Sequence, residues 1–211
     1  TEVYDADLSS YFDTIPHDKL FLAIRKRITD GSILALIRQW LKSTIVEPNG
    51  LKKNPKGRGT PQGGVISPLL SNIYLHWFET CATLVAKGMN QVMSIVRYAD
   101  DFVILAKELQ GRFVQGIVGE LEGRFGLVVN RDKTKVLDMR ADKAALGFLG
   151  YEFRFVKDRH YGTGGKYLSF GPSKKSVAKV CAKVKELTLS IFKPVKNEEV
   201  VQRVNKILVG W

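Results

Sequence analysis

Two adjacent carboxylates lie between two apolar segments near the middle of the chain. Residues 92–96 precede Tyr98-Ala99-Asp100-Asp101, and residues 102–105 follow it. Both flanking segments are short and rich in β-branched residues, which is typical of strands. The pattern therefore predicts a β-hairpin with the two acids at its tip. Because an Asp pair beside buried strands is costly unless something neutralises it, we expect a divalent cation there.

The rest of the chain alternates between short strand patterns and amphipathic helix patterns. Strands are predicted at 3–8, 44–47, 135–138, 149–156 and 166–170, and helices at 16–28, 32–42, 67–86, 109–125, 173–191 and 197–208. Ser67-Pro68 is a good helix start, with Ser as the N-cap. The 32–42 helix carries an apolar stripe that we expect in the core, namely Ile33, Leu36, Ile37 and Trp40. The order of elements predicts an α+β fold with a small, mostly antiparallel sheet backed by helices, then an all-helical piece.

The charge balance favours a polyanionic partner. The formal net charge is +12, and from Pro172 onward the basic residues outnumber the three acids. Basic clusters of this kind favour nucleic acid, although a bland basic surface has the same composition. No apolar run reaches the length of a membrane span and no signal peptide is visible, so we expect a cytoplasmic protein with no membrane partner.

The two cysteines, Cys81 and Cys181, lie far apart in helix-like segments. We expect two buried free thiols rather than a disulfide. The chain has three His and no CxxC motif, which argues against zinc. Any metal should therefore be a hard cation held by oxygens.

Asp7 supplies a third carboxylate that could reach the hairpin tip. Strand alternation places Asp5 and Asp7 on one face of the 3–8 strand and the apolar residues on the other. Two-metal phosphoryl transfer needs carboxylates that hold two divalent ions about 3.5–4 Å apart. Asp7 and Asp100 on neighbouring strands could do this. If the backbone stays extended, Asp101 points differently from Asp100 and is the more peripheral ligand. The alternative is a pair of turn aspartates that only cap the hairpin.

Several motifs occur in the order and spacing of a known family. They are residues 7–13, 59–72, 98–101, 126–135 and 147–151. With them, the chain closely resembles reverse transcriptases of the group II intron, or intron-encoded maturase, type over nearly its whole length. The resemblance implies a polymerase palm at 1–171 and the start of a helical thumb, or maturase domain, at 172–211. The fingers region that the family places before the first catalytic strand is absent from these residues.

The resemblance also implies a role for each motif residue at the nucleotide. Asp7, Asp100 and Asp101 would form the triad that binds two Mg²⁺ ions, with Mn²⁺ as a substitute. Phe12 would lie beneath the sugar of the incoming nucleotide, where its ring would exclude a 2′-hydroxyl. The loop against the nucleotide and template would be formed by Gln62 and Gly63, since Gly allows close backbone approach and Gln offers a donor and an acceptor.

Other motif residues would act on the leaving group and on the primer. Lys133 would lie at the pyrophosphate end of the site, where a cation can protonate or neutralise the leaving group. A plain surface lysine is the alternative. The primer grip would be the hairpin of Phe148, Leu149, Gly150 and Tyr151. Contacts to the phosphate backbone would come from the Lys-rich face of the 173–191 helix, with Lys174, Lys175, Lys179 and Lys183.

The implied function is RNA-directed DNA synthesis from deoxynucleoside triphosphates, on an RNA template with a DNA primer. A maturase role on intron RNA accompanies it. Without the fingers, we expect this piece to fold but to polymerise poorly by itself. The alternatives are a splicing maturase with an idle polymerase site and a two-metal nuclease. Retron and CRISPR-associated reverse transcriptases share this palm, and residues 60–64 favour the intron type.

Overall fold

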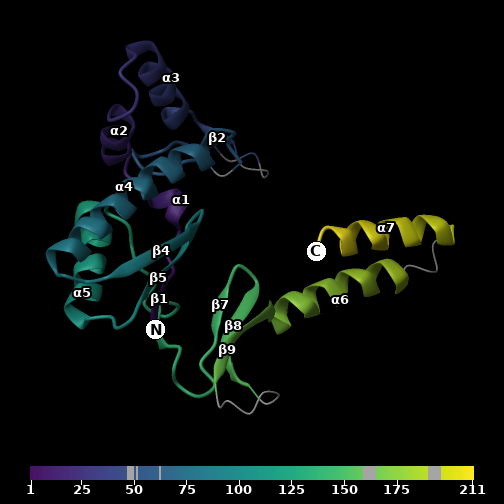
Figure 1. Cartoon of the computed structure of the whole chain (residues 1–211). Coiled ribbons are helices and arrows are strands. Elements are labelled where there is room, and N and C mark those ends of the chain that lie inside the picture. The colour runs from purple at the N-terminus through teal and green to yellow at the C-terminus, as the bar shows by residue number, and fades with distance from the viewer. Residues whose placement is uncertain (47–49, 51, 62, 159–164, 190–195) are drawn as a thin grey trace. The chain divides into compact units, whose positions relative to one another are not determined.

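A computed structural model describes residues 1–46, 50, 52–61, 63–158, 165–189 and 196–211 (Figure 1). The chain divides into two units, Thr1–Arg140 and Ala141–Trp211. Antiparallel sheets and helices occur together, so the predicted α+β class is confirmed. The predicted boundary at residues 171 and 172 falls inside the second unit, where the chain changes from strand to helix. The division into palm and thumb stays a prediction.

The first unit is built on a four-stranded antiparallel sheet with the order β4-β5-β1-β6. Its strands are β1 (Glu2–Ala6), β4 (Met93–Tyr98), β5 (Asp101–Ala106) and β6 (Lys135–Asp138). The predicted hairpin of β4 and β5 is confirmed, with Tyr98 paired to Asp101. Strand β1 lies between β5 and β6, so the end of β1 lies next to the hairpin tip.

The helices of the first unit are α1 (Tyr11–Thr14), α2 (His17–Arg25), α3 (Gly31–Lys42), α4 (Ser67–Gly88) and α5 (Gly111–Gly119), which continues as the π-helical turn η1 (Glu120–Arg124). A short hairpin joins β2 (Ile45–Val46) to β3 (Lys52–Lys53). Asp30 caps α3 by accepting hydrogen bonds from two backbone N–H groups of its first turn. Gly126 ends the π-helical turn with a φ of 62°, as the sequence predicts.

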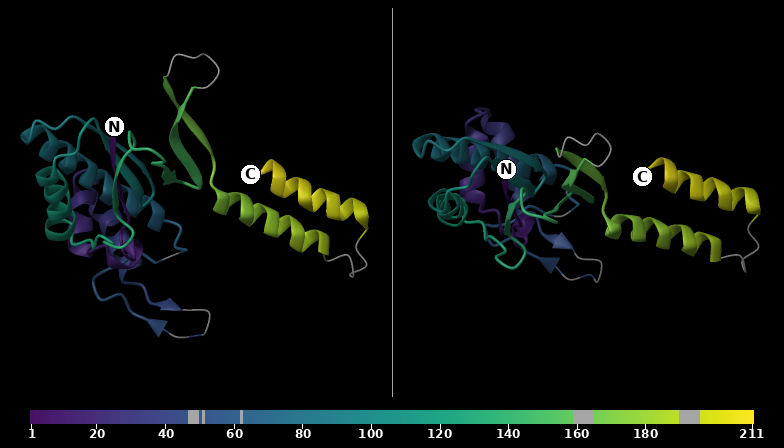
Figure 2. Two further views of the ribbon diagram at one scale, coloured as in Figure 1. Left: turned by 90° about the horizontal axis from the view of Figure 1, so that it is seen from below. Right: turned by 60° about the horizontal axis from the view of Figure 1, so that its bottom comes forward.

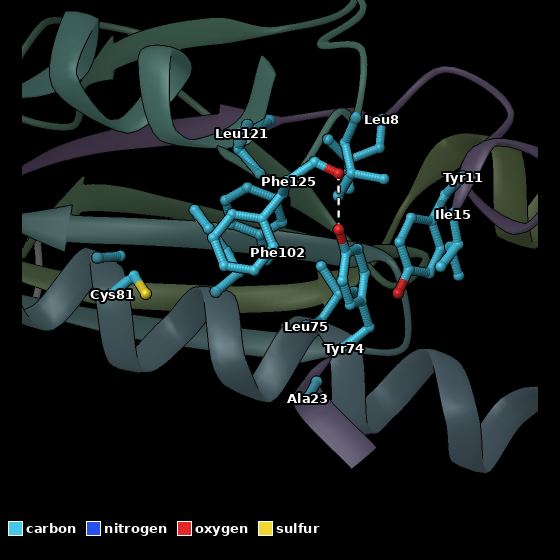
Figure 3. Packing of buried hydrophobic residues seen from close by; sticks show 14 of the residues in the cluster. Leu8, Tyr11, Ile15, Ala23, Tyr74, Leu75, Cys81, Phe102, Leu121 and Phe125 are labelled. Atoms are coloured by element: carbon cyan, nitrogen blue, oxygen red, sulfur yellow. Dashed lines mark hydrogen bonds between the residues drawn. The ribbon is translucent and has the colours of Figure 1, made fainter. Parts of the chain in front are cut away.

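One face of the sheet carries the core and the other carries acids. Tyr4, Ala6 and Phe102 are buried in a cluster with residues of α2, α4 and α5. Figure 3 shows the part of this cluster around Phe102 and Phe125. Phe125 packs edge-on against Tyr74 and Phe78 of α4. Alternation along β1 and β5 therefore sends Asp5 and Asp101 to the face opposite the helices.

The buried Tyr74 hydroxyl gives a direct test of this packing. Its Oη donates to the Phe125 carbonyl at 2.7 Å (Figure 3). Tyr74→Phe should lower the free energy of unfolding by about 1–3 kcal/mol, because the carbonyl is left without its donor. Tyr4→Phe is the matched control, since the buried Tyr4 hydroxyl has no partner among the described residues. That variant should be as stable as the parent or more so. Equal losses in urea unfolding would contradict this account.

The second unit contains a three-stranded antiparallel sheet and two helices. The strands are β7 (Leu146–Phe148), β8 (Tyr151–Lys157) and β9 (Lys166–Pro172), in that order. The helices α6 (Lys174–Leu189) and α7 (Asn197–Val209) follow and lie side by side in both views of Figure 2. Ser173 caps α6, since its Oγ accepts from the Ser176 backbone N–H.

Some predictions about individual residues are wrong. Ile33, Leu36 and Trp40 are each 46% exposed, and Ile37 is the buried member of the predicted stripe. Leu41, one turn beyond Ile37, is buried in their place, so the helix is rotated relative to the predicted core face.

Two further residues are placed differently from the predictions. Ile66 rather than Ser67 precedes α4, and the Ser67 hydroxyl donates to the Pro61 carbonyl at 2.7 Å. Cys81 is buried but Cys181 is exposed, and both are free thiols.

Helix α1 has no counterpart in the predicted elements. The predicted turn at 157–165 lies largely outside the described residues. Within the described parts of the chain, no helix is long and apolar enough to cross a membrane.

Candidate active site

Asp7 follows β1 and is fixed through its backbone by the segment before β6. The Asn130 N–H donates to the Asp7 carbonyl at 2.9 Å, and the Asp7 N–H donates to Thr134 Oγ1 at 3.3 Å. The Ser9 N–H donates to the Val128 carbonyl in the same region. These bonds attach residues 128–134 alongside the end of β1. As a result, Lys133 Nζ lies 3.5 Å from Asp7 Oδ2.

The hairpin tip is a tight turn with an unusual backbone. Tyr98 pairs with Asp101, so Ala99 and Asp100 alone form the turn. Ala99 has a φ of 54°, in the left-handed region that a residue with a Cβ seldom adopts. The expectation that Asp101 is peripheral rests on an extended backbone, and the backbone turns here. That reason for ranking Asp100 above Asp101 is therefore wrong, although the ranking itself stays a prediction.

The register brings Asp101 next to Asp7. Ala6 and Phe102 form the last pair of the ladder, and Asp7 and Asp101 are the next residues beyond it on the two segments. The charge of Asp7 acts on Asp101, as expected for neighbouring carboxylates. Both side chains belong to the sheet face opposite the helices, because Phe102 points into the core. Asp5 shares this face and pairs in register with Lys135 of β6.

The acids influence one another electrostatically. Burial raises the pKa of Asp101, the charges of Asp100 and Asp7 raise it further, and Lys133 partly offsets them. Burial also raises the pKa of Asp5, where Lys135 lowers it and Asp101 and Asp7 raise it. The site thus gathers more negative charge than its lysines balance, which favours an added cation.

The donor set suits a divalent ion. Carboxylate oxygens are the ligands that Mg²⁺ and Mn²⁺ prefer, and bound cations relieve repulsion between acids. Asp7, Asp100 and Asp101 would hold the ions. No three His, Cys, Asp or Glu side chains among the described residues stand at the spacing of a metal cage. Lys133 is the cation that contacts Asp7 here. The metal-binding triad stays a prediction.

Phe12 lies in α1, a short distance along the chain from Asp7. Its ring is partly buried and packs edge-on against Tyr11 at 5.3 Å. The Thr60 N–H donates to the Phe12 carbonyl at 2.7 Å, so the start of the 59–72 motif is attached to α1. Gly63 is exposed with a φ of 86°. Gln62 lies outside the described residues.

A polar network that the sequence did not predict lies next to the hairpin tip. Arg97 of β4 contacts Glu79 and Asn72 of α4 and the Ala99 carbonyl. A charged residue within an otherwise apolar strand was the available signal, because such a residue needs partners.

The second unit brings together two groups of predicted residues. Phe148 pairs with Tyr151, and Leu149 and Gly150 form the turn, with φ values of 50° and 81°. This predicted primer-grip hairpin is attached to α6, because the Ser173 N–H and the Ser176 hydroxyl both donate to the Gly150 carbonyl at 2.8 Å.

A cavity of about 460 Å³ lies beside that turn. Leu149, Gly150 and Tyr151 line it together with Lys179 and Lys183. Lys206 and Trp211 also line it, and the sequence analysis did not single them out. Lys174 and Lys175 are exposed on α6 but are not part of the lining. The cavity is therefore basic and partly aromatic.

The four-stranded sheet of the first unit carries Asp5 and Asp101 on the face opposite its helices. Residues 1–153 match the family described as reverse transcriptase (RNA-dependent DNA polymerase). The chain belongs to the reverse transcriptase family, whose members act on nucleic acids and typically use divalent metals.

Two curated relatives illustrate the match. Protein YkfC from Escherichia coli K12 is 32% identical over 188 residues, covering 74% of this chain and 47% of the relative. Group II intron-encoded protein LtrA from Lactococcus lactis is 42% identical over 72 residues, covering 34% of this chain and 12% of the relative. The chain thus spans about half of the first relative and a small part of the second.

Solved structures support the fold. Apo telomerase from Candida tropicalis, truncated from its C-terminal domain, superposes with a TM-score of 0.59 at 16% identity, over 72% of this chain and 34% of that one. Telomerase from Candida albicans with a fragment of telomeric RNA gives 0.59 at 15% identity, over 98% and 39%. At these identities the likeness concerns the fold alone.

Proposed function

We propose that the protein performs RNA-directed DNA synthesis by two-metal nucleotidyl transfer. The observation that carries this proposal is the pairing of β1 with β5, which brings Asp7 opposite Asp101 beside Lys133. The match to the reverse transcriptase family over residues 1–153 supports RNA as the template and deoxynucleoside triphosphates as substrates. The whole protein's activity and partners are part of the proposal.

The carboxylates hold the reacting groups in place. Divalent ions bound by Asp7, Asp100 and Asp101 would activate the primer 3′-hydroxyl and stabilise the triphosphate oxygens. Lys133 Nζ lies 3.5 Å from Asp7 Oδ2, and its place beside the acids supports a role in neutralising the pyrophosphate that leaves. The sheet and its backbone bonds to residues 128–134 keep these side chains in register.

Phe12 would select the sugar. Its carbonyl is fixed by the Thr60 N–H and its ring by contact with Tyr11, so the side chain has little freedom to move away. A fixed ring beneath the sugar would collide with a 2′-hydroxyl. Gln62 and Gly63 would border the same nucleotide.

The second unit would hold the primer and the duplex. The basic cavity beside Leu149 and Gly150 supports a phosphate-binding role, since Lys179 and Lys183 line it. Lys174 and Lys175 extend the positive charge along α6.

Similarity to intron-encoded proteins favours a second role as a maturase. The LtrA match and a 42% identical protein in the cob intron of Schizosaccharomyces pombe both cover about a third of this chain. We therefore include intron RNA among the proposed partners.

Primer extension on an RNA template tests the proposed synthesis. It is best run with the longest natural form of the protein beside the 211-residue chain, for which we expect weak extension. Incubation of labelled duplex with Mg²⁺ distinguishes extension from nuclease shortening. Absence of extension by the longest form would contradict the proposal.

Sugar selection has its own test in Phe12→Ala. This variant should incorporate ribonucleotides at least about tenfold more readily relative to deoxynucleotides, because the ring no longer blocks the 2′-hydroxyl. Phe21→Ala, which removes another partly buried ring of the first unit, is the control and should keep the original preference. An unchanged preference in Phe12→Ala would remove Phe12 from this role.

A further inference from the structure

The side chain of Arg97 contacts the turn that carries Asp100 and Asp101. Arg97 Nη1 donates to the Ala99 carbonyl at 2.9 Å. That carbonyl belongs to the peptide bond joining Ala99 to Asp100. Its position therefore fixes the peptide plane at the centre of the turn.

The same guanidinium is anchored on α4 at two points. Arg97 Nε lies 2.6 Å from Glu79 Oε1, and Nη1 lies 2.8 Å from Asn72 Oδ1. The Arg97 side chain is 13% exposed, and its contacts with Glu79 and the Ala99 carbonyl are partly buried. Charge-assisted hydrogen bonds of the planar guanidinium define an orientation as well as a distance. Arg97 thus connects the turn to a long helix of the core.

The turn needs such support because Ala99 adopts a left-handed conformation. A residue with a Cβ at a φ of 54° is strained, and strained backbone persists only where its surroundings hold it. The hairpin pairing of Tyr98 with Asp101 closes the turn but places no bond on the Ala99 carbonyl. The bond from Arg97 supplies it.

We propose that Arg97 is a positioning residue, which holds the strained Ala99–Asp100 peptide against α4 so that Asp100 and Asp101 are presented to the metal ions. Arg97 touches neither substrate nor metal in this role. The role in metal binding rests on the proposed function. The attachment of the Ala99 carbonyl to α4 through Arg97 rests only on the contacts of Arg97.

The decisive variant is Arg97→Lys. Lysine keeps the positive charge, but its single ammonium would have to replace both Nε, which bonds Glu79, and Nη1, which bonds Asn72 and the Ala99 carbonyl. We expect the fold to survive, the NMR chemical shifts of Ala99 and Asp100 to move, and Mn²⁺ affinity to fall about tenfold. Adding Ala99→Gly should restore the affinity to within about twofold, because glycine adopts positive φ without strain. Rescue by glycine at this position is a result that a general loss of stability would not give.

Several outcomes separate the possibilities. Unchanged shifts at Ala99 in Arg97→Lys would overturn the proposal, as would failure of Ala99→Gly to rescue a folded protein. The NMR measurement needs no metal, so it shows whether Arg97 holds the Ala99–Asp100 peptide even if Mn²⁺ does not bind. If the parent protein binds no Mn²⁺, or binds it equally well without Asp7 and Asp101, that result would instead count against the proposed function. Arg154→Lys in β8, another strand arginine paired with a glutamate, is the control and should change neither readout.

Discussion

Asp101→Asn should lower RNA-templated primer extension by about 10³-fold or more. The amide keeps the size of the side chain but removes the negative charge that would hold a divalent ion opposite Asp7. Extension rates at saturating primer, together with Mn²⁺ binding to the 211-residue chain, measure the effect. Asp100→Asn in the same assays shows which acid of the turn matters more.

The same variant should be at least as stable as the parent at neutral pH. Burial and the charges of Asp100 and Asp7 raise the pKa of Asp101 above its ordinary value of 3.8. A carboxyl with a raised pKa contributes stability below its unfolded pKa, and this contribution is lost as pH rises through the folded pKa. Asparagine does not ionise, so the Asp101→Asn variant does not lose this stability as the pH rises. The free energy of unfolding of the variant, relative to the parent, should therefore rise with pH from about 3.8 upward.

Asp132→Asn provides the control for charge. Asp132 is exposed and adjacent in sequence to Lys133. Its neutralisation should leave extension within about twofold of the parent, as expected for the loss of an exposed side chain. An Asp101→Asn protein that extends primers as fast as the parent would remove Asp101 from the mechanism.

Gly59→Ala should lower the free energy of unfolding by about 2–4 kcal/mol. Gly59 has a φ of 86°, and a Cβ there would lie 3.0 Å from the carbonyl oxygen and 3.2 Å from the Cα of Asp13. These are backbone atoms, so they cannot rotate away. The Gly59 N–H also donates to the Ile15 carbonyl at 2.8 Å, which holds the two segments together.

Gly57→Ala separates the two causes of this loss. Gly57 has a φ of 73°, but a Cβ there would meet no atom within 4 Å. It should cost only the conformational part, about 1 kcal/mol. Urea unfolding of both variants measures the difference. Equal losses would show that the close approach of Gly59 to Asp13 carries no weight.

The sequence predicts those parts of the fold that depend on local pattern. The hairpin of β4 and β5 follows from the two short segments rich in β-branched residues that flank residues 98–101. The common direction of the Asp5 and Asp7 side chains follows from strand alternation. The conformation of the turn could not be predicted, because Ala99 is not a residue that favours a positive φ. The contacts of Arg97 could not be predicted either, because its partners Glu79 and Asn72 lie on a helix distant in sequence.

The exposed apolar residues of α3 show a different limit. A stripe such as Ile33, Leu36 and Trp40 predicts that a helix is amphipathic, but the direction in which the helix faces depends on packing between distant segments. Primer-grip and thumb roles stay predictions, although the structure brings Leu149, Gly150 and Tyr151 to one cavity with Lys179 and Lys183.

The pair of hydrogen bonds accepted by the Gly150 carbonyl has a mechanical consequence. Two donors at the start of α6, the Ser173 N–H and the Ser176 hydroxyl, converge on one acceptor at the hairpin tip. The turn at Leu149 and Gly150 and the start of α6 should therefore move together. A force applied along α6 would be transmitted directly to Leu149 and Gly150.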